Sequence, residues 1–170
     1  MIYLSNFAAS GNHPDAVSIA AITPRGFKGG VRKDLAPPFS LVKAYKDEKI
    51  TEAEYIMEYG KRIYSLDIER IAGELDGKIL LCYCDKNAMC HRTLLGLFLN
   101  TELGVEVEEI GGFGELFTVP FNEVGNPLTL FLTPEQIEKH GLQDLGTNNI
   151  IGKWRELKKR NLLNLFSPKE

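Results

Sequence analysis

Apolar runs alternate with proline- and glycine-rich segments over the first forty residues. Residues 2–7 and 16–22 are short, mostly apolar runs bounded by glycine or proline, which is typical of buried strands. Residues 24–40 contain several prolines and glycines, so we predict a long irregular loop there. Loops of that length inside a compact domain are usually functional.

Helical signals begin at residue 51. The segment Thr51-Glu52-Ala53-Glu54 is a capping box, and it predicts a helix that runs to about Tyr64. A second helix is predicted after Asp67, with Gly77 as its C-terminal cap residue. Its apolar residues have the i, i+3, i+4, i+7 spacing of one helix face: Ile68, Ile71, Ala72 and Leu75.

The clearest unit is a strand, a helix and a second strand within about thirty residues. Residues 78–84 are almost continuously apolar, as expected for a strand buried on both faces. We predict a loop at residues 85–89, an amphipathic helix at 90–103 that ends at Gly104, and another strand at 105–110. Such crossovers are parallel and right-handed. The sequence therefore predicts an α/β fold, a small and mostly parallel sheet flanked by helices in a Rossmann-like three-layer arrangement.

The pattern changes beyond Gly111, where glycines and prolines interrupt the chain. Residues 133–136 (Thr-Pro-Glu-Gln) form another capping box, with proline at the first helical position. A last helix is predicted at about residues 149–163. We expect residues 1–110 to form the α/β domain and residues 111–170 to form a C-terminal helical extension that packs on it.

Composition narrows the function classes. The chain has 44% hydrophobic and 25% charged residues, a net charge of −3 and a pI near 5.7. This charge gives no overall attraction to nucleic acid, so a polyanion would need a local patch. Apolar runs stay far below the roughly 20 residues of a spanning helix, and the first residues lack a signal-peptide pattern. We therefore expect a cytoplasmic protein with no membrane association.

The three cysteines, Cys82, Cys84 and Cys90, fall within nine residues. Ligands bind at the carboxyl ends of strands in open parallel sheets, and Cys90 stands at such an end, where a helix begins. The helix N-terminus favours an anion, and together with His91 and Arg92 it would lower the pKa of the Cys90 thiol. In the alternative interpretation, Cys90 merely packs beneath the helix while Arg92 is a surface charge.

A zinc site is the main rival interpretation, because Cys82, Cys84, Cys90 and His91 supply four potential ligands. Two expectations argue against it. Cys-x-Cys along an extended strand would spread the thiols, and His91 would point about 100° away from Cys90 on a helix. We therefore predict no metal site.

Two other thiol motifs do not fit the spacing. A tyrosine-phosphatase loop needs Cys-x5-Arg, whereas one residue separates Cys90 from Arg92 and seven separate Cys84 from it. A redox motif of the Cys-x2-Cys type is absent from the sequence.

Residues 80–83 (Leu-Leu-Cys-Tyr), a short loop and then Cys90-His91-Arg92 at a helix start resemble the signature of a bacterial and phage family, domain of unknown function 488. The resemblance covers about residues 1–110. Cys-His-Arg with the upstream cysteine is its most specific element. Further matching elements are Ser5-Asn6-Phe7, Pro24 with the basic loop after it, Leu35-Ala36-Pro37, Tyr55 and Tyr59.

This resemblance favours a functional role for Cys90, His91 and Arg92, although it implies no established reaction. The chain departs from the family at Cys84, where members often have glutamate in a Leu-Cys-Tyr-Glu run. A general base at that position in relatives would have no carboxylate counterpart here.

Several further residues are candidates for ligand binding. Arg25 lies in a basic, glycine-rich loop that could fold over a phosphate, or that is simply solvated. Ser5 and Asn6 end the first strand and are expected to reach the same pocket. Cys82 and Cys84 border it. Tyr59 shares a helix face with Tyr55, in a position that suits either core packing or ligand stacking.

Together these features favour an enzyme, a cysteine-centred transferase or hydrolase that acts on a phosphorylated or nucleotide-like ligand. Cys90 would be the nucleophile or an anion contact and His91 an acid–base or orienting group, while Arg92 and Arg25 would neutralise phosphate. Two alternatives remain, a non-catalytic module that binds a nucleotide or a nucleic-acid end, and a phage or host interaction protein. The glycines at 26, 29 and 30 fit no nucleotide-binding fingerprint, so we expect no cofactor, and a homodimer is left open.

Overall fold

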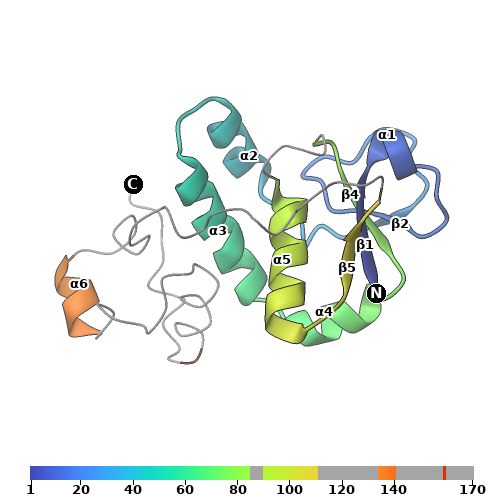
Figure 1. Ribbon diagram of the computed structural model, residues 1–170. Coiled ribbons are helices and arrows are strands. Elements are labelled where there is room, and N and C mark those ends of the chain that lie inside the picture. The colour runs from blue at the N-terminus through green and yellow to red at the C-terminus, as the bar shows by residue number, and fades with distance from the viewer. Residues whose placement is uncertain (85–89, 111–133, 141–158, 160–170) are drawn as a thin grey trace.

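The computed structural model describes residues 1–84, 90–110, 134–140 and 159 of the chain. Figure 1 shows their arrangement. The elements in chain order are β1 (Ile2–Asn6), α1 (Phe7–Ser10), β2 (Ala16–Ser18), β3 (Gly30–Val31), α2 (Phe39–Lys46), α3 (Glu52–Tyr64), α4 (Ile68–Glu74), β4 (Ile79–Cys82), α5 (His91–Leu103), β5 (Val107–Glu109) and α6 (Pro134–Lys139).

Five parallel strands form one sheet within the described residues, in the order β3-β2-β4-β1-β5. The first strand of the chain therefore lies between β4 and β5. The chain reaches β5 from β4 through α5, which confirms the predicted crossover. The predicted fold class, a parallel sheet flanked by helices, is confirmed.

The two faces of the sheet differ in what covers them. Side chains alternate along each strand, so Leu4 and Leu80 join the main core with residues of α3, α4 and α5. Ile79 and Leu81 point to the opposite face, where they form a smaller cluster with Ala16. In Figure 1, α3 and α5 lie on the same side of the sheet.

A glycine sets the distance between α5 and the sheet. A Cβ added at Gly96 would lie 2.7 Å from Cδ1 of the buried Leu4 and 3.2 Å from Cγ1 of Val107. Real Cβ atoms essentially never approach so closely, so the absence of a side chain at Gly96 allows α5 to lie directly on β1 and β5.

The predicted helix signals have the expected geometry. Thr51 and Glu54 form both bonds of the capping box at the start of α3. The carboxylate of Asp67 accepts a hydrogen bond from the backbone N–H of Arg70 and begins α4. Gly104 ends α5 with a φ of 64°. Gly77 also has a positive φ of 73°, but α4 ends earlier, at Glu74.

Several boundaries differ from the prediction. The strand predicted at 16–22 ends at Ser18, and the strand predicted at 78–84 ends at Cys82. Helix α2 lies in a segment where the sequence predicted no helix. It was not predicted because it follows two prolines and has no side-chain cap. The predicted helix at 149–163 lies largely outside the described residues. None of the described helices combines the length and the apolar character that crossing a membrane requires.

Candidate functional site

The candidate site residues Cys82, Cys90 and His91 lie where β4 ends and α5 begins, at the carboxyl edge of the sheet. Residues at or just beyond the ends of β2 and β4 meet there with the N-terminus of α5 and with side chains of α2 and α3. Between them is a cavity of about 610 Å³. It is lined by Ala20, Ala21, Ile22, Phe39, Val42, Tyr45, Lys46, Tyr55, Cys82, Tyr83, Cys84, Cys90 and His91.

The three thiols form a tight cluster in the wall of this cavity. Their sulfur atoms all lie within 4.8 Å of one another, and the sulfurs of Cys82 and Cys90 are 2.9 Å apart. The expectation that Cys-x-Cys would spread the thiols is wrong, because β4 ends at Cys82 and the chain bends at Tyr83. This spacing could hold one metal ion.

His91 is buried, and its ring is fixed by two contacts. Nε2 lies 2.7 Å from the carbonyl oxygen of Ile19, so Nε2 carries the hydrogen that it donates to this oxygen. Nδ1 lies 3.6 Å from the sulfur of Cys90. The expectation that His91 would point away from Cys90 is therefore wrong. Burial lowers the pKa of His91 to about 4, so the imidazole is neutral at pH 7.

Arg92 is fully buried, which contradicts the alternative interpretation of a surface charge. Its guanidinium donates hydrogen bonds to the carbonyl oxygens of Ser5 at 2.6 Å and of Cys84 at 3.3 Å. Nη2 lies 2.7 Å from a carboxylate oxygen of Glu109. Arg92 thus connects the ends of β1, β4 and β5 and is absent from the cavity lining. Burial raises the pKa of Glu109 to about 7, and Arg92 opposes this shift.

The sequence predicts a lowered pKa for the Cys90 thiol, and the structure indicates the opposite direction. Burial raises the pKa of the Cys90 thiol well above its ordinary value, because little solvent reaches it to stabilise a negative charge. The hydrogen bond between the side chains of Cys82 and Cys84 raises the pKa of Cys82 to about 12. The pKa of Cys84 is lowered, because its sulfur accepts hydrogen bonds from the thiols of Cys82 and Cys90. The positive charge of Arg92 lowers it further.

Three of the predicted ligand-binding residues use their polar groups within the protein. The hydroxyl of Ser5 is buried and lies 2.7 Å from the hydroxyl of Ser10. The side chain of Asn6 accepts a hydrogen bond from the backbone N–H of Ala9 and caps α1. The hydroxyl of Tyr59 donates to the carbonyl oxygen of Leu35 at 2.8 Å, and its ring packs edge-on against His91.

Tyr59→Phe is expected to lower the free energy of unfolding by about 1–3 kcal/mol, because the buried carbonyl of Leu35 loses its donor. Urea unfolding measures this. Tyr83→Phe is the matched control, since Tyr83 is 56% exposed and should change stability by less than about 0.5 kcal/mol. Equal stability of Tyr59→Phe and the parent protein would contradict a structural role for this hydroxyl.

The cavity that Cys90 lines does not include Arg25 or Arg92 among its described lining residues. Arg25 is exposed and is not among the residues that line the cavity. The lining instead includes Phe39, Tyr45 and Lys46 of α2, which the sequence interpretation missed together with their helix. The signal was present in the spacing of Phe39, Val42 and Lys46, since i, i+3 and i+7 share one helix face.

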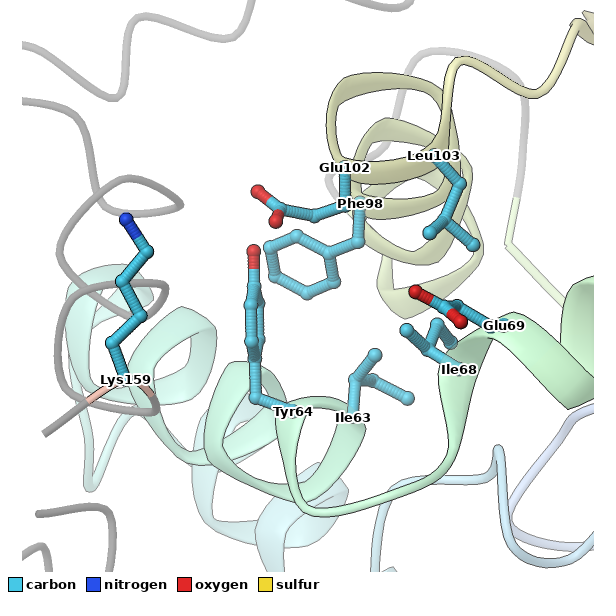
Figure 2. A pocket seen from close by; sticks show the side chains of 8 residues that line it. All are labelled: Ile63, Tyr64, Ile68, Glu69, Phe98, Glu102, Leu103 and Lys159. Atoms are coloured by element: carbon cyan, nitrogen blue, oxygen red, sulfur yellow. The ribbon is translucent and has the colours of Figure 1, made fainter. Parts of the chain in front are cut away.

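A second cavity of about 290 Å³ lies among side chains of α3, α4 and α5, away from the thiols. Figure 2 shows the rings of Tyr64 and Phe98 side by side, with the carboxylates of Glu69 and Glu102 and the ammonium group of Lys159 at its margins. The described lining contains no cysteine or histidine, so this cavity has none of the chemistry of the site cavity.

The fold and the site define a class, namely α/β domains with a Cys-His-Arg segment where a helix begins at the carboxyl edge of a parallel sheet. A family model described as "Active DUF488-N3 subclade" matches residues 14–103, more than half of the chain. The chain therefore belongs to the domain of unknown function 488 family, as its motifs indicate. Searches of curated proteins and of solved structures give no significant match.

Proposed function

We propose that this chain is an enzyme, a cysteine-centred transferase or hydrolase, that acts on a nucleotide-like ligand in the site cavity. The observation that carries the proposal is the presence of three thiols and a neutral imidazole in the lining of one cavity. A volume of about 610 Å³ is within the usual range for small-molecule sites, about 300–1,000 Å³.

Cys84 is the thiol that a ligand reaches most easily. It is partly exposed, whereas Cys82 and Cys90 are 1% and 2% exposed. We therefore assign the attacking sulfur to Cys84 and a supporting position to Cys90, which the sequence had favoured as the nucleophile. Cys84 also occupies the position at which family members often have glutamate, so both residues present an ionisable group at the same place.

His91 is suited to an acid–base or orienting role. A base that lies near a nucleophile and is itself oriented by a third group is the usual arrangement of an activated cysteine. Here the third group is the carbonyl of Ile19, which directs Nδ1 toward the thiol cluster. Arg92 does not line the cavity, but its guanidinium donates a hydrogen bond to the carbonyl oxygen of Cys84 and so fixes the position of that residue.

The cavity lining favours a base or nucleoside over a polyphosphate. Phe39, Tyr45 and Tyr83 supply aromatic surface, and base–aromatic stacking contributes about 1–3 kcal/mol per base. Among the described lining residues, Lys46 is the one lysine, and there is no arginine. One lysine suits a nucleoside or a nucleoside monophosphate, so the expected phosphate recognition by Arg92 and Arg25 is not part of this proposal.

Thermal-shift measurements with nucleosides and their mono-, di- and triphosphates test the ligand class. At equal concentration, nucleosides or monophosphates should stabilise the protein most, and a compound present at 100 times its Kd should add about 2.7 kcal/mol. Phe39→Ala should weaken that binding about tenfold through lost stacking. Val31→Ala is the matched control, since Val31 is also exposed and is not among the lining residues. No stabilisation by any compound would contradict the ligand class.

The reaction is tested with whichever compound binds. Mass spectrometry should detect conversion by the parent protein, and Cys84→Ser should abolish conversion while keeping the thermal shift. Binding without conversion by the parent protein would overturn the enzyme assignment in favour of the non-catalytic module.

A further inference from the structure

We propose that Cys82, Cys84, Cys90 and His91 form a four-ligand site for Zn²⁺. This inference goes beyond the proposed function and changes one role in it, because Nδ1 of His91 cannot bind zinc and act as an acid–base group at the same time. Three cysteines and one histidine are one of the common ligand sets of protein-bound zinc. The two reasons for rejecting such a site from the sequence, spread thiols and a diverging imidazole, do not hold in the structure.

The distances between the three sulfur atoms are close to those in a zinc site. Zn–S bonds of about 2.3 Å at tetrahedral angles place two sulfur ligands about 3.8 Å apart. The sulfurs of Cys82 and Cys90 are 2.9 Å apart, and none of the three pairs exceeds 4.8 Å. The shortest of these distances and the upper limit both lie within about 1 Å of that spacing.

His91 has the tautomer of a fourth ligand, but it is not among the residues whose ligand atoms all lie within 4.8 Å of one another, so Nδ1 would move toward the sulfurs when zinc binds. With a Zn–N bond of about 2.0 Å, a nitrogen and a sulfur ligand lie about 3.6 Å apart. Nδ1 of His91 is 3.6 Å from the sulfur of Cys90. Histidines that bind metals usually donate their other ring N–H to a carbonyl or carboxylate, and Nε2 of His91 faces the carbonyl of Ile19 at 2.7 Å.

The surroundings favour the net negative charge of such a site. Three thiolates and one Zn²⁺ ion carry a net charge of −1. Nη1 of Arg92 lies 3.5 Å from the sulfur of Cys82, and the backbone N–H of Cys84 donates to the same sulfur at 3.4 Å. Cys90 is also the N-cap residue of α5, where the helix dipole favours negative charge.

Bound zinc would also bear on the chemistry of the thiols. A sulfur bound to zinc is a thiolate, so the metal would hold Cys84 in its ionised form next to the cavity. The metal would also connect the end of β4 to the start of α5, two elements that Arg92 of α5 already connects through its contacts with Cys82 and Cys84.

Zinc content of untagged protein tests the inference directly. Elemental analysis of protein purified from zinc-supplemented medium should give about one zinc per chain. His91→Ala should lower the affinity for zinc at least about tenfold, because changing even the outer partners of a ligand costs about 10–100-fold. His13→Ala is the matched control, since this exposed histidine lies outside the cluster and should keep full zinc content.

A second measurement covers variants that fail to fold. Parent protein stripped of metal and titrated with Co²⁺ should develop a thiolate-to-cobalt charge-transfer band and the visible bands of tetrahedral cobalt. Absence of zinc together with absence of these bands would overturn the site. A disulfide between Cys82 and Cys90 in freshly purified protein, seen as one free thiol instead of three, would also overturn it. Full zinc affinity in folded His91→Ala would refute the assignment of His91 as the fourth ligand.

Discussion

Glu109→Gln is expected to lower the free energy of unfolding by about 3–5 kcal/mol above about pH 8, the usual cost of removing one partner from a buried ion pair. At that pH the carboxylate is ionised, although burial raises its pKa to about 7. The carboxylate lies 2.7 Å from Nη2 of Arg92, and the two side chains are 1% and 0% exposed. Glutamine keeps the shape of glutamate but removes its charge. The buried guanidinium therefore keeps its cost of desolvation and loses the attraction of this carboxylate. Urea unfolding followed by circular dichroism measures the difference.

Glu108→Gln provides the control on the same strand. Glu108 is exposed, so its replacement should change stability by less than about 0.5 kcal/mol. Equal losses in the two variants would mean that strand β5 responds to any change of charge. That result would remove the special role assigned to the ion pair between Arg92 and Glu109.

Phe98→Ala is expected to cost about 3–5 kcal/mol of stability. Phe98 is fully buried on α5, and its ring packs edge-on against Tyr64 at a centroid distance of 5.5 Å. It also borders the second cavity, so truncation would enlarge a space of about 290 Å³ that already exists there. Thermal or urea unfolding of the variant measures the loss.

The matched control is Phe39→Ala, which removes the same side chain from a position that is 55% exposed. It should cost much less stability than Phe98→Ala, although it is expected to weaken ligand binding. Phe98 is not among the residues that line the site cavity, so Phe98→Ala should bind ligand normally while it remains folded. A reversal of this pattern would contradict the separation of core from site.

The α/β architecture could be predicted from the sequence, because helix caps and apolar patterns are set by residues that are near one another in the chain. The capping box at Thr51 and the cap at Asp67 depend on neighbours within three residues, and both form as predicted. Helix α2 was missed because Pro38 precedes it and no side chain caps it. The two residues of β3, Gly30 and Val31, are exposed and too few to produce an alternating pattern.

The location of the site could be predicted, but its electrostatics could not. A strand end followed by a helix start is visible in the sequence around Cys90. The burial of Arg92, on α5, depends on its ion pair with Glu109, on β5. In the sequence alone, nothing distinguishes Glu109 from an exposed glutamate. The low pKa of Cys84 depends on thiols brought together by a bend at Tyr83, a feature that residue spacing alone does not determine.

The position of β1 in the sheet also determines when the sheet can assemble during synthesis. β1 and β2 both pair with β4, which is made about seventy residues after β1. At about 5–20 residues per second, β1 therefore waits roughly 4–15 s for its first partner. Throughout that interval the nascent chain carries an apolar strand with both edges unpaired. Slowing translation before residue 79 would prolong that exposure, whereas slowing it after residue 110 would leave it unchanged.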